Sequence, residues 1–263
     1  MVNKREGGMD KQAAFWLEAL GASGELSATM KHELDTQGYT IVHGVADADW
    51  LAAMRERIDY LVEKEGENLA VEHHQEETAT RVANLVNKGV VWEKVWSHPL
   101  ILSACRYIFE GEFKISSLNA REALYNGGHQ PLHADWKKPR PDFPKVHLVN
   151  TIWAIDDLYA ANGAPRIIPA THLRPELPED VLEDVGLPHP DEVIFEAPAG
   201  SVMIYNAHAW HGGTTNREGS RRRVLHGLYI DREDTAQQDQ RRWLTPETAS
   251  RLTPAQKWLL DVE

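Results

Sequence analysis

Hydrophobic spacing along the chain changes from a helical period to a strand-like period. Apolar residues recur at helical intervals over 10–20, 47–66 and 97–109, so we predict an amphipathic helix in each of these segments. Side chains in 39–43 instead alternate between the two sides of the backbone after Gly38, which predicts a short strand. The first part of the chain is therefore predicted to be mainly helical.

Short apolar or alternating runs, separated by turn residues, dominate the chain from residue 112 onward. Six or more such runs within about 120 residues are typical of a sandwich or a double-sheet jelly roll. We expect one domain, with a mainly helical buttress and a short strand in 1–110 and a jelly-roll core in 112–232. Two Thr-Pro pairs predict further helices in 233–263, because threonine caps a helix and proline fits its first turn.

Composition and charge narrow the class of protein. The 263-residue chain has a net charge of −12, which argues against a nucleic-acid partner because proteins that bind phosphates usually present a basic face. Cys105 is the single cysteine, so no intrachain disulfide forms, and no apolar run approaches a membrane span. We expect a soluble, cytoplasmic protein without a signal peptide or membrane contact; the oligomeric state stays open.

The segment "HQPLHADW", residues 129–136, contains the first candidate chemistry. His133 and Asp135 are two residues apart, so in an extended strand both side chains point to one face, where they could share a metal ion. A third ligand is available from His208 or His211 in "YNAHAWHGGTTN". Two imidazoles and one carboxylate leave three adjacent positions free on iron(II). The alternative is a hydrogen-bonded pair on a surface strand.

The segment "SRRRVLHGLYI" contains the candidate anion site. In a strand, Arg222 shares a face with Val224 and Leu228, whereas Arg221 and Arg223 point the other way into solvent. A buried guanidinium without a partner is costly, so an inward arginine implies an anion such as the distal carboxylate of a dicarboxylate. A register error of one residue would exchange these arginines, and a solvated cationic strand end is the alternative.

Three segments together resemble the phytanoyl-CoA dioxygenase family of iron(II)/2-oxoglutarate oxygenases: "HQPLHADW", "NTIWAIDDLYAANGAPRIIPATH" and "GSVMIYNAHAWHGGTTNREGSRRRVLHGLY". The resemblance spans roughly 33–232. It implies a mostly β fold with flanking helices around a double-stranded β-helix core. It also implies that His133, Asp135 and His211 are the catalytic metal ligands and that Arg222 binds 2-oxoglutarate.

Further residues are candidates on the same resemblance. Gln130 and Thr151 are expected near the co-substrate, with a packing role as the alternative for Thr151. Three tryptophans that flank the ligands or lie on a lining strand are expected to contact substrate, with core packing as the alternative: Trp136, Trp153 and Trp210. Val224 departs from the Ser or Asn that some relatives use beside the arginine, which puts the detail of co-substrate binding in doubt.

The implied activity is that of a dioxygenase with iron(II), 2-oxoglutarate and O2, which hydroxylates a small molecule and releases succinate and CO2. Asp135 argues against a halogenase, because related halogenases lack this carboxylate. Desaturation, cyclisation and epoxidation stay open, as does the substrate. The alternatives are a catalytically silent jelly roll that binds a small acid or a metal, and a cupin-like metalloenzyme that does not use 2-oxoglutarate.

Two polar segments are expected to border the mouth of the site. The stretch 67–80 is predicted to be a loop, with His73 and His74 solvated, and 174–192 is a proline-rich acidic excursion between strands. Their acidic character suggests a cationic or polar substrate.

Overall fold

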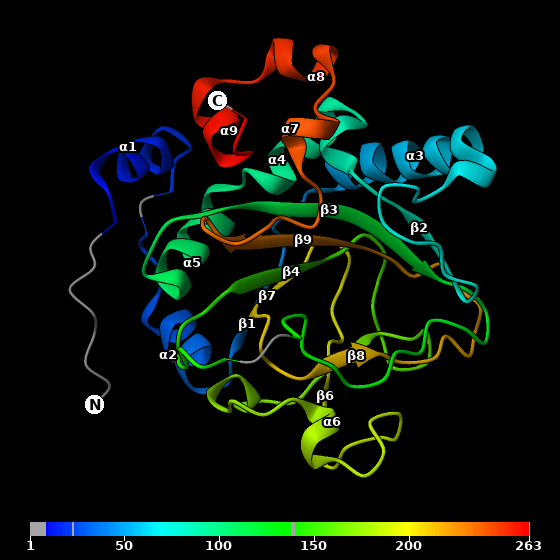
Figure 1. Cartoon of the computed structure of the whole chain (residues 1–263). Coiled ribbons are helices and arrows are strands. Elements are labelled where there is room, and N and C mark those ends of the chain that lie inside the picture. Colours follow the sequence, from blue (N-terminus) through cyan, green and yellow to red (C-terminus); the bar gives the residue numbers. More distant parts are fainter. Residues whose placement is uncertain (1–8, 23, 138–139, 263) are drawn as a thin grey trace.

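A computed structural model of the chain describes residues 9–22, 24–137 and 140–262. Its strands form two sheets, which face each other in Figure 1. In this described part, the larger sheet has six antiparallel strands in the order β1-β7-β4-β9-β3-β2, and the smaller sheet has three in the order β6-β5-β8. The strands are β1 (Tyr39–Val42), β2 (Ala79–Val82), β3 (Phe113–Ala123), β4 (Leu148–Ala154), β5 (Pro165–Ile167), β6 (Val193–Ile194), β7 (Val202–Asn206), β8 (His211–Gly213) and β9 (Arg223–Asp231). The jelly-roll prediction is confirmed.

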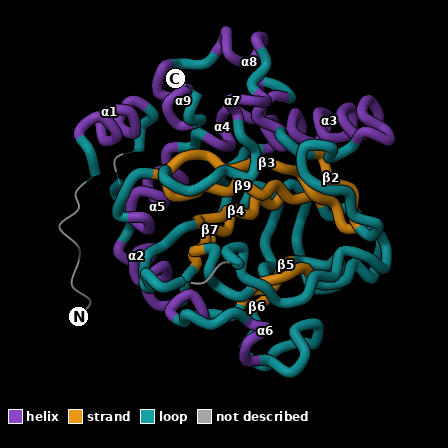
Figure 2. Tube along the Cα trace, in the orientation of Figure 1, coloured by secondary structure: helices purple, strands orange, loops and turns teal. Residues whose placement is uncertain are grey.

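Most helices cover the outer face of the larger sheet, and the smaller sheet lies on its inner side together with the short helix Pro178–Val181 (Figures 1 and 2). The helices are α1 (Lys11–Ala19), α2 (Ala28–Thr36), α3 (Ala48–Glu65), α4 (Glu93–Trp96), α5 (Pro99–Phe109), α6 (Pro178–Val181), α7 (Gln240–Trp243), α8 (Pro246–Arg251) and α9 (Pro254–Leu259). Short 3-10 turns occur at Gly66–Asn68, Leu85–Asn87, Val90–Trp92 and Thr171–Leu173. The three long helices predicted from hydrophobic spacing are confirmed as α1, α3 and α5.

Local sequence signals explain where several helices begin and end. The Asp47 carboxylate accepts from the backbone N–H of Trp50 and caps the start of α3, and Gly66, with φ +50°, is the cap that follows its last residue. Thr245 and Thr253 cap α8 and α9 in the same way, each followed by a proline at the first helical position. None of the described helices is both long and apolar enough to span a bilayer.

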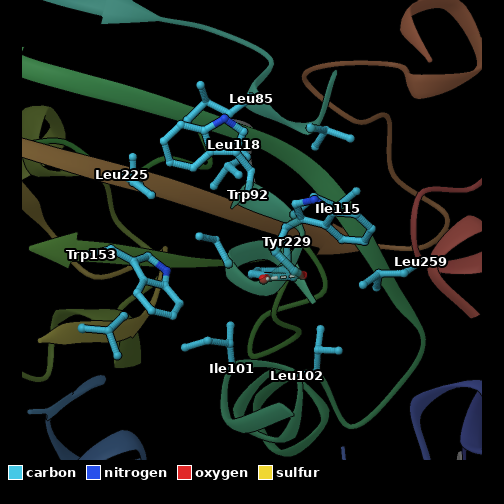
Figure 3. Close-up of a cluster of buried hydrophobic side chains, with 14 of the residues drawn as sticks. Leu85, Trp92, Ile101, Leu102, Ile115, Leu118, Trp153, Leu225, Tyr229 and Leu259 are labelled. Atoms are coloured by element: carbon cyan, nitrogen blue, oxygen red, sulfur yellow. Dashed lines mark hydrogen bonds between the residues drawn. The ribbon is translucent and has the colours of Figure 1, made fainter. Parts of the chain in front are cut away.

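The main hydrophobic core lies between these helices and the larger sheet (Figure 3). Trp92 and Ile101 from the helical side meet Leu118, Trp153 and Tyr229 from the strands, and each of these side chains is buried. Burial of large apolar side chains is the main favourable free-energy change in folding. This core anchors one face of β3, β4 and β9, and the opposite face of the same strands is free to build a site.

The first part of the chain contributes two strands to the sheet, whereas the sequence predicted one. The predicted strand at 39–43 is confirmed as β1, which pairs with β7. The second, β2, occupies Ala79–Val82 and pairs with β3, so it begins at the end of the stretch predicted to be a loop. A four-residue edge strand carries too short an alternation to be seen locally, and its pairing partner is distant in sequence.

A β-bulge in β3 decides which side chains face the inner side of the sheet. The register with β9 shifts between Ile115 and Ser117. Before the bulge Ile115 faces the helical core, and after it Leu118 faces that core. Strict alternation from Ile115 would send Arg121 into the helical core, whereas the extra residue turns Arg121 to the inner side.

Candidate metal centre and co-substrate pocket

Three side chains that are distant in sequence converge on one point between the two sheets. One ligand atom from each of His133, Asp135 and His211 lies within 4.8 Å of the others. Oδ1 of Asp135 is 3.9 Å from Nε2 of His133 and 3.6 Å from Nε2 of His211. Among the described residues, this is the only group of three or more His, Cys, Asp or Glu side chains so arranged.

Backbone pairing fixes this convergence. His133 and His211 form an antiparallel bridge, and each backbone N–H donates to the carbonyl of the other at 2.9 Å. The Asp135 N–H donates to the carbonyl of Ala207 at 3.0 Å. Gly212 permits the close approach, because a Cβ there would lie 2.7 Å from the carbonyl oxygen of Gln130.

Hydrogen bonds orient the donor atoms toward the shared point. Nδ1 of His133 lies 2.8 Å from the carbonyl of Pro131, and Nδ1 of His211 lies 2.9 Å from the carbonyl of Ala209. A carbonyl only accepts, so each Nδ1 carries a proton and Nε2 is the nitrogen left for a metal, which displaces any proton that the adjacent Asp135 favours there by raising the pKa of His211. Both histidines therefore have the tautomer that a metal site requires.

Two residues hold the other oxygen of the carboxylate. Asn150 donates its amide to Oδ2 of Asp135 at 3.0 Å, and the Tyr205 hydroxyl lies 3.4 Å from the same oxygen and 3.1 Å from Nε2 of His211. Burial would raise the pKa of Asp135, but the adjacent imidazoles and Asn150 lower it well below its usual value. The carboxylate therefore stays ionised, as a metal ligand must.

His208, the alternative third ligand, does not join this group. It is 2 % exposed, and its Nε2 accepts from the backbone N–H of His147 at 3.1 Å. Burial and the nearby Arg140 and His147 lower the pKa of His208 to about 2, so it is a neutral core histidine. The geometry favours His211.

A cavity of about 470 Å³ opens beside the three ligands. Arg222 lines it, is 1 % exposed, and has no hydrogen-bond partner for Nε or Nη1 within the described residues. Burial and the neighbouring Arg121 lower the pKa of Arg222 to about 9, which measures how poorly the charge is compensated. A carboxylate that receives both N–H groups would supply the missing partner.

The neighbouring arginines both have carboxylate partners, whereas no ion pair is found for Arg222 among the described residues. Arg221 is half exposed and pairs with Glu122 and Asp59. Arg223 was expected to be solvated, and this is wrong: it is 6 % exposed and its guanidinium pairs with Asp156 at 2.8 Å. The expectation failed because a carboxylate on the neighbouring β4 end compensates the charge that the sequence assigned to water.

Of the two residues predicted to lie near the co-substrate, the structure places only one in the cavity. Gln130 lines the cavity, as expected. Thr151 does not: it is fully buried on the helical face of β4 and donates its hydroxyl to the carbonyl of Gly227 at 3.1 Å. Asn150 and Ile152 are the residues of β4 that reach the cavity, because side chains alternate along the strand. Thr151 is therefore not part of the proposed site.

None of the three predicted substrate tryptophans lines the cavity. Trp153 packs in the helical core, 5.7 Å from the ring of Trp50. Trp136 stacks on His147 at 4.1 Å, and Trp210 is 1 % exposed. Each tryptophan is adjacent in sequence to a residue that faces the cavity, namely Asp135, Ile152 and His211. Because neighbouring side chains in extended backbone point to opposite sides, each tryptophan points away from the cavity and into the core. The core-packing alternative holds for all three.

Of the two segments expected at the rim, 67–80 borders the cavity and 174–192 does not. His73 and His74 line the cavity instead of facing only solvent. The acidic excursion 174–192 does not line it; it packs behind the metal-binding segment, where the backbone N–H of Leu132 donates to the carbonyl of Val185 at 2.8 Å. Sequence reasoning missed the cavity-lining Arg81 and Arg121 altogether, because each depends on pairing between strands remote in sequence.

The donor set and the arginine fit iron(II) and 2-oxoglutarate respectively. Two imidazoles and one carboxylate suit iron(II) and leave adjacent positions free, and a guanidinium that lacks a partner in the described part of the chain suits a dicarboxylate. Within jelly-roll proteins, this combination defines the class of non-haem iron oxygenases that use 2-oxoglutarate.

The chain belongs to the phytanoyl-CoA dioxygenase (PhyH) family, whose model matches residues 34–224. Among curated proteins, it is 26 % identical to "Dioxygenase af480" of Aspergillus fumigatus over 152 residues, 57 % of this chain and 48 % of that protein. It is 27 % identical to the uncharacterised protein Rv1501 of Mycobacterium tuberculosis over 207 residues, 73 % of this chain and 71 % of that one. The match to af480 thus spans about half of that relative.

Solved structures share the fold at low sequence identity. The carbocyclase SnoK from nogalamycin biosynthesis, described as non-haem and α-ketoglutarate dependent, superposes with a TM-score of 0.65 at 22 % identity, over 88 % of this chain and 92 % of that chain. HygX from Streptomyces hygroscopicus, with nickel and 2-oxoglutarate bound, superposes with a TM-score of 0.65 at 13 % identity, over 81 % and 90 %. At these identities the likeness establishes the jelly-roll fold.

Proposed function

We propose that this protein is an iron(II)/2-oxoglutarate-dependent dioxygenase that acts as one domain and hydroxylates a small molecule, with release of succinate and CO2. The single observation that carries the proposal is the buried guanidinium of Arg222, whose Nε and Nη1 have no partner among the described residues, in the cavity that also contains His133, Asp135 and His211. A metal site alone would not need it. The structurally similar HygX holds a metal ion, nickel, together with 2-oxoglutarate, which supports joint binding of a metal ion and 2-oxoglutarate here.

Each residue has a defined task in this proposal. Nε2 of His133, Nε2 of His211 and Oδ1 of Asp135 hold the metal, and Arg222 binds the distal carboxylate of 2-oxoglutarate. Gln130 lines the same cavity and offers an amide to the co-substrate. When bound, iron(II) with 2-oxoglutarate supplies the oxygen activation, and the protein supplies placement and charge.

Anaerobic titration tests the proposal. Addition of iron(II) and then 2-oxoglutarate to the wild-type protein should produce the visible charge-transfer band of the chelate, and O2 should then give succinate. Asp135→Ala should lose both signals, because one of three metal ligands is absent. Arg221→Gln, a change outside the cavity, should retain both.

Other outcomes identify the alternatives. Binding of iron(II) and 2-oxoglutarate without succinate formation would indicate a silent binding module. Turnover that is indifferent to Arg222→Ala would indicate a metalloenzyme that does not use 2-oxoglutarate. Because solved relatives include a carbocyclase and an epimerase, mass spectrometry of the product decides whether an oxygen atom is inserted.

A further inference from the structure

The cavity wall has more positive than negative side chains, and joint binding of the proposed metal and co-substrate does not change this balance. Its described lining includes four cationic side chains, Arg81, Arg121, Arg222 and Lys137, and one carboxylate, Asp135. Iron(II) and 2-oxoglutarate carry equal and opposite charges, so their joint binding leaves this balance unchanged. The excess stands out in a chain whose net charge is −12.

Arg81 and Arg121 form the part of this excess to which the proposed metal and 2-oxoglutarate site assigns no role, although Arg121 is a neighbour of Arg222. They are directly opposite each other in the register of β2 and β3, and they are 8 % and 2 % exposed. Like charges directly opposite on a sheet repel each other, and burial increases the penalty. Two arginines in this position therefore require a nearby negative charge to offset their own positive charges.

Glu76 compensates only one of the two charges. Its Oε1 accepts from Nε of Arg81 at 2.9 Å, and its Oε2 accepts from Nε and Nη2 of Arg121 at 2.9 and 2.7 Å. One carboxylate thus bridges two guanidiniums and fixes both. Nη1 of each arginine has no hydrogen-bond partner among the residues that the structure describes, and both side chains line the cavity.

The rest of the surrounding wall offers polar groups without negative charge. His73 and His74 line the same cavity, and burial followed by the charge of Arg81 lowers the pKa of His73 to about 4, so it is neutral near pH 7. The acidic excursion 174–192 is absent from the lining. Nothing in the described wall therefore favours a cationic substrate, contrary to the expectation from the acidic segments.

We infer that the substrate is a small organic acid, whose carboxylate binds to the Nη1 groups of Arg81 and Arg121 while iron(II) and 2-oxoglutarate occupy the metal end of the cavity. This inference rests on the proposed function. Glu76 positions both guanidiniums, and His73 and His74 supply neutral hydrogen-bonding groups beside them. Two donors from two arginines match the two oxygens of one carboxylate.

Equilibrium dialysis of the anaerobic iron(II) protein with saturating 2-oxoglutarate tests this inference. The probes are a pool of small carboxylic acids and a second pool with the primary amide of each acid, analysed by mass spectrometry. The charge-transfer band of the chelate is recorded before the probes are added, so failure of the proposed function is seen separately. Acids that enter should leave this band in place, because they bind outside the 2-oxoglutarate site.

Arg81→Gln is the test variant, because it leaves Glu76 paired with Arg121 and creates no unpaired carboxylate. We expect the wild type to retain acids at least tenfold over their amides. Arg81→Gln should lose this preference by tenfold or more and keep its affinity for 2-oxoglutarate, and Arg221→Gln, which changes the net charge equally outside the cavity, should behave as the wild type.

Three results would overturn the inference. They are equal retention of acids and amides, retention of neither pool at millimolar concentration, and a loss of 2-oxoglutarate affinity in Arg81→Gln in place of a loss of acid binding. If phosphate monoesters of the same skeletons are retained more strongly than the acids, the recognised group is a phosphate and the inference of a carboxylate is wrong.

Discussion

The side-chain amide of Asn150 donates to Oδ2 of Asp135 at 3.0 Å, on the opposite side of the carboxylate from the two imidazoles. This bond fixes the carboxylate so that Oδ1 faces Nε2 of His133 and of His211. Residues that orient metal ligands in this way commonly change metal affinity by 10- to 100-fold when they are replaced.

Asn150→Ala should therefore weaken iron(II) binding by roughly 10- to 100-fold without removing a ligand. The measurement is anaerobic titration with iron(II), or with cobalt(II) as a spectroscopic probe. Unchanged affinity would show that the amide does not orient Asp135.

Thr151→Val is the matched control for Asn150→Ala, because Thr151 is the next residue on the same strand and its side chain lies on the opposite face. It removes the hydroxyl that donates to the carbonyl of Gly227, so the free energy of unfolding should fall by about 1 kcal/mol. Affinities for iron(II) and 2-oxoglutarate should remain those of the wild type. A clear rise in the Kd for 2-oxoglutarate would return Thr151 to the site.

Arg222→Met should separate stability from function. Methionine removes a buried charge that has no partner among the described residues, so the free energy of unfolding without ligands should rise by about 1–3 kcal/mol. The Kd for 2-oxoglutarate should rise by about 100-fold, because the charge-assisted bonds to its distal carboxylate are lost. Chemical denaturation and ligand titration give the two quantities, and loss of stability together with unchanged 2-oxoglutarate affinity would contradict the assignment.

His208 should make folding stability depend on pH. Its pKa is lowered by burial to about 2 from an ordinary 6.5, so below pH 6.5 the unfolded chain binds a proton that the folded chain does not. The contribution of neutral His208 to the free energy of unfolding is fully present above pH 6.5 and is lost progressively as the pH falls toward 2. At pH 5 the decline is about 2 kcal/mol.

His208→Gln should remove this contribution, and Gln can still accept the bond from the backbone N–H of His147. The difference between the free energies of unfolding at pH 7 and pH 5 should then be smaller than in the wild type by about 2 kcal/mol. Urea denaturation at the two pH values measures it. An identical pH dependence in both proteins would refute a neutral, buried His208.

Gly212→Ala should disturb the metal centre from the neighbouring residue. The added Cβ would lie 2.7 Å from the carbonyl oxygen of Gln130, so β8 must shift, and the free energy of unfolding should fall by about 1–3 kcal/mol. Iron(II) affinity should fall with it, because the shift moves His211. Gly111→Ala, where the nearest atom lies 3.7 Å away, is the control and should leave metal binding unchanged.

The sequence by itself determined those parts of the protein that local spacing encodes. Hydrophobic period located α1, α3 and α5, and the two-residue spacing of His133 and Asp135 placed both on one face of an extended segment. The jelly-roll class followed from the run of short strands.

Only the tertiary structure decided which residues meet. His211 joins His133 because two remote segments pair, and Arg121 faces the cavity because one bulge in β3 reverses the alternation that local sequence would predict. Arg223 is neutralised by Asp156 from another part of the chain, which leaves Arg222 as the free cation among these described neighbours. Spacing along one strand specifies a face, but which face is turned toward which partner depends on long-range register, and that is settled by packing of the whole chain.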